Sequence, residues 1–277
     1  MKKFVTVAAA IAALGFAGAA SAADLPVKAV QAPVIAPDLW TGFYLGLSAG
    51  GRWNKDPWTA TGFEIPAVPT FVTGRDNPHD FTSSSGRFGL YGGYNWRIQQ
   101  MWVVGLEADV AWARNKSSNA GIPGLIGLPG GFGQGDTTQV KDSWDAGIRA
   151  RAGYLITPTT LLYATGGVSW MKSEASLTCS TAGPPASWCT GTNQTSGRTD
   201  TASKTVVGWT LGGGIEGVIA PNWLLRGEYR YTNYQGYHVT LMQGGGALPN
   251  IDVVDADIGR IRTHTALIGL AYRFGGL

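Results

Sequence analysis

Charged residues are scarce in this chain of 277 residues. Lysine and arginine together number 21 and aspartate and glutamate 18, so the formal net charge at neutral pH is only +3. Two of the positive charges, Lys2 and Lys3, stand at the N-terminus. A charge this small and balanced gives no basic surface of the kind that nucleic-acid binding requires. We therefore expect no nucleic-acid partner.

Long apolar runs are absent after residue 22. Residues 1–3 are basic, residues 4–19 are apolar and small, and residues 20–22 read Ala-Ser-Ala. This order is typical of a secretory signal peptide cleaved after Ala22. Nothing further along reaches the roughly 18 consecutive apolar residues of a membrane-spanning helix. The sequence predicts an exported protein with a signal peptide at 1–22, followed by a proline-containing periplasmic tail at 23–39.

Cysteine and histidine are rarer still, with two and three residues respectively. Cys179 and Cys189 lie ten residues apart, and export to an oxidising compartment favours a disulfide between them. A metal or redox pair is the alternative. His79, His238 and His264 are expected to be solvated, with haem or metal capture at the surface as the alternative. We predict no metal site and no cofactor.

Glycine and aromatic residues are plentiful, a mixture that suits strands joined by long loops. In residues 206–231 apolar side chains alternate with small or charged ones on both sides of a tight turn at Pro221. This period of two predicts a β-hairpin. One face is apolar and aromatic, and the other carries Glu216, Arg226, Glu228 and Arg230.

The same alternation recurs along the chain. The predicted strands are 42–54, 86–97, 101–113, 143–156, 160–172, 206–219, 223–231 and 262–274.

The connections between these strands alternate in length. Short turns lie near Gln99, Pro158 and Pro221, whereas 55–85, 114–142, 173–203 and 235–261 are each roughly thirty residues long. Such long loops are unusual in a compact soluble domain, and strict alternation gathers them at one end. The sequence predicts an all-β fold over residues 40–277: an eight-stranded antiparallel up-and-down transmembrane β-barrel with four long external loops and short periplasmic turns. A soluble sandwich, the alternative, would invert inside and outside.

Aromatic residues bracket the predicted strands. Trp102 and Trp112 stand ten residues apart on one face of a strand, and ten tilted residues rise roughly 25 Å, the height of the apolar band of such a barrel. Two aromatic girdles follow from this spacing. The periplasmic girdle comprises Trp96, Trp102, Tyr154 and Trp223, and the outer girdle Trp112, Trp144, Trp170, Trp209 and Tyr231.

The opposite faces of the strands would project charged side chains into the barrel. An eight-stranded barrel is just wide enough for side chains to fill it, and buried charges must be paired. We predict a filled lumen held by ion pairs, with a narrow channel of slight anion preference as the alternative. The predicted lumen residues are Arg87, Arg97, Glu107, Asp109, Asp145, Arg149, Arg151, Glu216, Arg226, Glu228, Arg230 and Arg273.

Signals for an enzyme are weak. Lipid-deacylating membrane barrels use a His-x-Ser pair, but neither His238 nor His264 is followed by serine at that spacing. The three consecutive glycines at 212–214 lie within a strand and precede no helix, so they form no phosphate-binding loop. We expect no enzymatic activity.

Three motifs carry a family resemblance: residues 40–46 (WTGFYLG), 89–95 (GLYGGYN) and 271–274 (AYRF). Together they resemble the small outer-membrane barrels called immunogenic or surface-antigen proteins of Gram-negative bacteria, often grouped as porin-family proteins. The resemblance implies an eight-stranded barrel, assembly by the outer-membrane barrel machinery and exposed antigenic loops. Some such relatives bind haem, and others are treated as porins. The chain departs from the family pattern because Gly275, Gly276 and Leu277 follow the terminal aromatic residue.

Two classes of function follow. The first is a structural surface antigen in the cell outer membrane that supports envelope integrity and presents its loops to lipopolysaccharide or a host. The second is a narrow porin, or a protein that captures haem or small solutes at the surface. The expected partners are outer-membrane lipid, lipopolysaccharide and the barrel-assembly machinery, with a host or haem ligand at the loops.

Overall fold

The computed structural model describes residues 38–65, 68–71, 79–123, 136–179, 198–242 and 253–275. The predicted signal peptide and residues 23–37 of the predicted tail lie outside this part of the chain. No helix in the described part is long and apolar enough to cross a bilayer.

All described regular structure is β-strand. The strands are β1 (Gly42–Ile65), β2 (Val68–Phe71), β3 (His79–Ile98), β4 (Trp102–Ala120), β5 (Thr137–Thr157), β6 (Thr160–Cys179), β7 (Arg198–Ala220), β8 (Trp223–Tyr234), β9 (Tyr237–Leu241), β10 (Val253–Ile258) and β11 (Ile261–Phe274).

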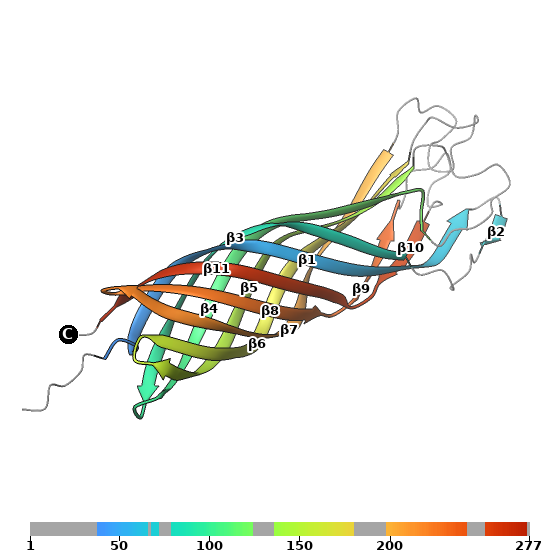
Figure 1. Ribbon diagram of the computed structural model, residues 1–277. Coiled ribbons are helices and arrows are strands. Elements are labelled where there is room, and N and C mark those ends of the chain that lie inside the picture. The colour runs from blue at the N-terminus through green and yellow to red at the C-terminus, as the bar shows by residue number, and fades with distance from the viewer. Residues whose placement is uncertain are drawn as a thin grey trace, which may run out of the picture. The chain divides into compact units, whose positions relative to one another are not determined.

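Eight strands close into a ring. Each pairs antiparallel with its neighbours in the order β1-β3-β4-β5-β6-β7-β8-β11, and β11 returns to β1 from Phe43–Phe274 to Arg262–Lys55 (Figure 1). Closure pairs the backbone groups that an open sheet would leave at its edges, which is a requirement inside lipid. The predicted eight-stranded antiparallel barrel is confirmed.

Short turns gather at one end of the ring. The β3–β4 and β7–β8 turns contain Gln99 and Asn222 at φ 59° and 65°, values in the left-handed region that turns use. Pro158 and Thr159 join β5 to β6. We call this the short-turn end, and the opposite end, where β1, β4 and β6 finish, the long-loop end.

The strands run further toward the long-loop end than predicted. β1 continues to Ile65, β4 to Ala120 and β6 to Cys179, and β7 begins at Arg198, so the predicted loops at 55–85, 114–142 and 173–203 are in part strand. In these extensions the apolar residues change from the outward face of the strand to the inward face. On β1 the outward side chains up to Trp53 are apolar or glycine, and from Trp58 onward the inward side chains, Trp58 and Ala60, are apolar. Beyond this point the outer face of the strand contacts water instead of lipid. The change in the apolar face made the alternation hard to recognise in the sequence, so the extension was predicted as a loop.

The fourth long connection also contains strands. β9 and β10 form a hairpin, and β10 pairs with β1 from Trp58–Ile258 onward, just beyond the point where β11 begins. The prediction of a loop throughout 235–261 was therefore wrong. The hairpin continues the barrel wall past the outer girdle because its inward residues, Val239, Leu241 and Val254 among them, are apolar and buried.

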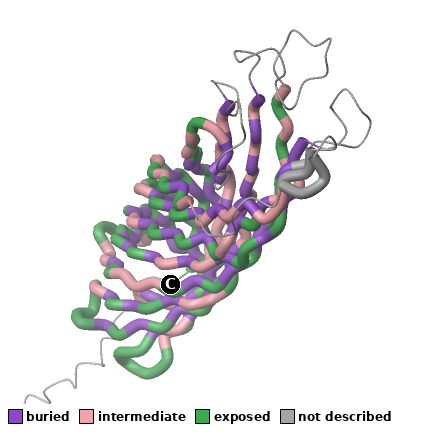
Figure 2. The backbone as a smooth tube through the Cα atoms, turned by 90° about the vertical axis from the view of Figure 1, so that its right-hand side faces the viewer, coloured by how far each residue is buried: buried purple, intermediate pink, exposed green. Residues whose placement is uncertain are grey.

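Within the ring the two faces differ as predicted for a barrel in lipid. Leu47, Phe88 and Ile268 point outward and are 65%, 66% and 66% exposed, whereas Arg149 and Arg226 point inward and are buried. Figure 2 shows this alternation of buried and exposed residues along the strands. An apolar exterior around a charged interior inverts the arrangement of a soluble sandwich.

The aromatic side chains predicted as girdles all lie on the outer face. Trp102 packs edge-on against Tyr154 with ring centroids 5.3 Å apart, and Trp112 pairs with Trp144 in register across β4 and β5. The remaining members also face outward: Trp96, Trp170, Trp209, Trp223 and Tyr231. Trp53 and Tyr272 also face outward, at the level of the outer and the periplasmic group respectively, so the outward aromatic residues form a band toward each end of the ring.

Replacing Ile268 with arginine tests whether the outward face between the girdles contacts lipid. Ile268 faces outward on β11 between the girdles, so Ile268→Arg should lower the free energy of unfolding from lipid bilayers by about 2–4 kcal/mol. Thr82→Arg, an outward change beyond the outer girdle, should cost about 0–1 kcal/mol. Urea titration of the protein in vesicles measures both. Equal stability of Ile268→Arg and wild type would contradict a lipid-facing surface.

Candidate functional site in the charged barrel interior

Asp109 on β4 joins three strands of the interior. Its carboxylate lies 2.8 Å from Nη2 of Arg87, 2.6 Å from Nη1 of Arg149 and 3.1 Å from Nη1 of Arg230. These arginines come from β3, β5 and β8 and are all buried. One carboxylate therefore ties both neighbouring strands and a strand across the barrel.

Glu107, two residues earlier on β4, forms the second junction. Its Oε1 accepts a hydrogen bond from Nη2 of Arg149 at 2.8 Å, and its Oε2 pairs with Nη1 of Arg226 on β8. Arg226 lies 3.7 Å from Glu228, which in turn pairs with Arg230 at 2.7 Å. Since Arg230 returns to Asp109, these ion pairs form a closed circuit inside the barrel.

Tyrosine side chains complete the hydrogen bonding. Tyr44 donates to Glu107 at 2.9 Å and accepts from Arg151 at 3.1 Å, and Tyr163 donates to Glu228 at 2.8 Å. Arg151 also pairs with Glu216 at 3.2 Å. The sequence prediction missed these tyrosines because it assigned aromatic residues to the lipid face, although their positions in the alternation are inward.

The circuit extends toward the long-loop end through Asp145. Arg87 reaches Asp145 at 2.6 Å, and Arg52 on β1 reaches it at 2.8 Å while also donating to Asn115. Arg52 was not predicted, yet it occupies an inward position of β1 and the alternation could have identified it. We call the whole set the interior network. Its members are Arg52, Arg87, Arg149, Arg151, Arg226, Arg230, Glu107, Asp109, Asp145, Glu216 and Glu228.

Two predicted lumen residues do not join the interior network. Arg97 donates to the carbonyl of Gln100 and lies 4.0 Å from Asp38, outside the membrane-spanning part. Arg273 donates to the carbonyl of Thr41 at 3.0 Å. Both face inward, but they stand at the short-turn mouth, where turn carbonyls are the nearest acceptors. Their assignment to the network was wrong because alternation gives the face of a residue and not its depth.

A pair of buried carboxyl groups, Asp56 and Asp142, lies beyond the outer girdle. Burial and the neighbouring Asp142 raise the pKa of Asp56 well above its usual range, and burial also raises the pKa of Asp142. One oxygen of each has no hydrogen-bond partner in the described part of the chain. A single proton shared by the pair would leave one negative charge, which balances the excess of one arginine in the interior network.

Apolar layers cover the interior network at both ends. Toward the long-loop end, buried Trp58, Phe81 and Leu177 belong to one apolar cluster. At the short-turn end, Trp40 is fully buried with Leu161 in another, and its Nε1 donates to the carbonyl of residue 158 at 2.9 Å. The charges therefore lie between two water-excluding layers.

The rarer residues lie away from this network. Cys179 is buried at the end of β6 and is disulfide-bonded, while its predicted partner, Cys189, lies outside the described residues. His79 packs edge-on against the Phe81 ring, His238 pairs with Asp257 at 2.8 Å, and His264 contacts the Tyr229 hydroxyl. The described residues contain no group of three or more ligands that could hold a metal.

The family model of the outer membrane protein beta-barrel domain matches residues 8–274. The chain belongs to this family. Membership, together with the closed ring and its apolar exterior, places the protein in the bacterial outer membrane.

Relatives within this family cover almost the whole chain. The 31 kDa outer-membrane immunogenic protein of Brucella melitensis is 30% identical over 279 residues, 96% of this chain and 98% of the relative. The 25 kDa outer-membrane immunogenic protein of Brucella canis is 29% identical and covers 99% of both chains. Among solved structures, the outer membrane protease OmpT from Escherichia coli covers 84% of this chain and 97% of its own, at 10% identity and a TM-score of 0.49. The predicted resemblance to outer-membrane immunogenic proteins is confirmed.

Removing one arginine of the closed circuit should lower the free energy of unfolding. Arg226→Met keeps the stacking volume over Tyr91 but leaves Glu107 and Glu228 short of a partner, so the free energy of unfolding should fall by about 3–5 kcal/mol. Arg97→Met, at the short-turn mouth, should cost less than about 1 kcal/mol. Denaturant titration in vesicles compares the two. Equal losses would contradict the interior network.

The carboxyl pair should make stability depend on pH. A carboxyl whose pKa is raised by folding stabilises the protein at low pH, and this contribution is lost as pH rises through the raised value, by about 1.4 kcal/mol per pH unit for one proton. Asp56→Asn removes the repulsion, so its stability should fall less than that of wild type as pH rises. The exposed Asp80→Asn is the control. Thermal unfolding between pH 5 and 9 measures the difference, and parallel profiles for wild type and Asp56→Asn would contradict the shared proton.

Proposed function

We propose that the protein is a structural anchor of the outer membrane that presents its long connections as surface antigens, and that it is neither an open pore nor an enzyme. The observation that carries this proposal is the interior network, which is internally paired and covered at both ends. A pore needs a continuous polar path with groups free to contact the solute. The described interior offers charged groups that already contact one another.

The number of strands supports the same function. Eight strands give a lumen that side chains just fill, whereas aqueous porins use sixteen or more. Arg149 and Glu107 are about 1% and 0% exposed at their side chains, so water outside the barrel does not reach them. A filled barrel is rigid, and rigidity suits an anchor that supports the envelope.

The arrangement of the long connections supports a role in presenting antigens at the surface. β1, β4 and β6 extend beyond the outer girdle, so the connections that follow them start away from the lipid surface. Relatives of matching length are named immunogenic proteins, which fits long connections exposed outside the cell. We take the long-loop end as the outer end on this basis.

Planar-bilayer recording tests the anchor against the narrow porin. The purified full chain should insert without steady conductance steps, because the apolar layers and the interior network leave no continuous water column. Heat modifiability on a gel, checked first on the same sample, establishes that the barrel is folded. A trimeric porin recorded in the same bilayers is the positive control. Steady, reproducible steps from folded protein would overturn the proposal and favour solute passage.

A further inference from the structure

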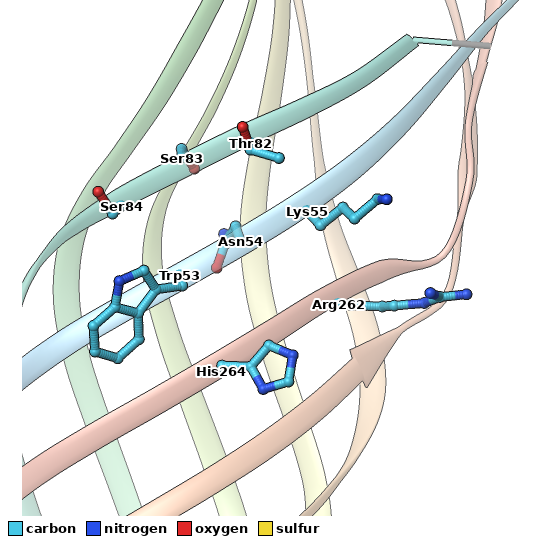
Figure 3. A pocket seen from close by; sticks show the side chains of 8 residues that line it. All are labelled: Trp53, Asn54, Lys55, Thr82, Ser83, Ser84, Arg262 and His264. Atoms are coloured by element: carbon cyan, nitrogen blue, oxygen red, sulfur yellow. The ribbon is translucent and has the colours of Figure 1, made fainter.

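A hollow lies on the outer face of the barrel just beyond the outer girdle. It measures about 450 Å³ and spans three adjacent strands, β3, β1 and β11. Figure 3 shows Lys55 and Arg262 at its outer side, with Trp53 and His264 nearer the membrane. Thr82 and its serine neighbours on β3 provide hydroxyl groups along the third side. Aromatic, hydroxyl and basic side chains thus share one site on the surface that faces lipid.

The two basic residues are placed opposite each other. Lys55 and Arg262 are register partners across β1 and β11, and both face outward. Arg262 has no ion pair within the described residues, while Lys55 contacts a half-exposed Asp80 at 2.7 Å. Two basic side chains on neighbouring strands suit a phosphate group, which can accept charge-assisted hydrogen bonds from both.

The height of the pair matches the headgroups of the outer leaflet. Phe43 and Trp53 bracket the outward face of β1, and the ten residues between these positions rise roughly 25 Å. Lys55 is the next outward residue, so it stands about 5 Å above the girdle. Lipid phosphates lie at this level, directly above the hydrocarbon region.

A second hollow of about 530 Å³ lies below the first on the same three strands, and Trp112 of β4 also lines it. The small residue Ala49 pairs in register with Phe88 on one side and Ile268 on the other, and all three face outward. The Trp53 indole folds back over Gly51 and marks the upper end of this line of small residues. The result is an apolar trough along β1 between bulkier neighbours, a shape that fits an acyl chain beneath the basic pair.

The distribution of charge around the barrel indicates the same leaflet. Among the described residues, outward basic side chains gather just beyond the outer girdle, whereas the outward ends of the strands at the short-turn end carry aromatic and aliphatic residues. On the strands of the ring the outward basic residues are Lys55, Arg114, Lys116, Lys141, Lys172 and Arg262. Two of them, Lys141 and Lys172, pair with Glu174 at 3.0 Å and 2.8 Å. This asymmetry matches a membrane with phosphate-rich lipid in the outer leaflet.

We propose that the two hollows bind one molecule of phosphorylated outer-leaflet lipid, the lipid A anchor of lipopolysaccharide. Lys55 and Arg262 hold a phosphate, Trp53 lies at the boundary of headgroup and chain, and an acyl chain fills the trough along Ala49. The site rests on the proposed outward orientation of the long-loop end. It gives the anchor a defined lipid partner on one side of the barrel.

Native mass spectrometry of the full chain in detergent tests the site with three probes. These are bisphosphorylated lipid A, the same lipid without its phosphates, and inorganic phosphate. Wild type should bind the bisphosphorylated lipid at least tenfold more tightly than the dephosphorylated lipid, and inorganic phosphate should not compete at millimolar concentration. Lys55→Gln/Arg262→Gln should remove the preference for phosphate, and Ala49→Leu should weaken both lipids by a similar factor.

Matched variants at outward positions that line neither hollow serve as controls. Lys116→Gln/Lys172→Gln removes the same charge from β4 and β6, and Ala150→Leu adds the same volume to an outward position of β5. Both should bind as wild type does. An equal loss of lipid binding in both charge variants would show diffuse electrostatic attraction and would overturn the site. Unchanged binding by Lys55→Gln/Arg262→Gln would also overturn it. So would competition by inorganic phosphate. The gel shift verifies folding of every variant.

The orientation is tested separately from the lipid site. An epitope inserted within residues 124–135 should be labelled on intact cells, whereas one at Gln99 should not. Labelling at Gln99 alone would overturn the orientation, and with it both proposals. Correct labelling without any preference for phosphate would overturn the lipid site and leave the anchor function standing.

Discussion

The structure depends on the cost of placing charge inside a closed barrel. A lone ionised group in a low-dielectric interior costs several kcal/mol, so it must find partners of opposite sign. Glu107 and Asp109 each contact two or three arginines from different strands, and the circuit through Arg226 and Arg230 closes on itself. This requirement fixes the register of strands that are distant in sequence and fills the barrel interior with paired side chains.

The remaining features follow from the change of solvent along each strand. Between the girdles lipid lies outside, so outward residues are apolar and polar groups turn inward. Beyond Trp53 water lies outside, and from Trp58 onward the inward residues of β1 are apolar. The apolar layer that closes the barrel is therefore a small soluble-type core built on the same strands. Where the two regimes meet, aromatic and basic side chains share the outer surface, as at Trp53 and Lys55.

Alternation of side chains predicted the ring, the outward girdles and most of the interior network, because a period of two assigns each residue to a face. It failed where the phase reversed, at 55–65 and 173–179, since the same period with opposite polarity reads as an irregular loop. It also placed Arg97 and Arg273 in the network, because depth along the barrel depends on the turns. The tyrosines, Tyr44 and Tyr163, were missed because an aromatic side chain suits lipid as well as a polar interior.

The coupling energy between Glu107 and Arg149 tests the paired interior of the barrel most directly. A double-mutant cycle of Glu107→Gln, Arg149→Met and the combined variant, with unfolding measured in vesicles, isolates their interaction. A paired interior predicts a coupling energy between the two side chains of about 1–3 kcal/mol. The combined variant should then lose much less stability than the sum of the two single losses. Additive losses, within about 0.5 kcal/mol, would show charges solvated independently and would contradict a paired, filled interior.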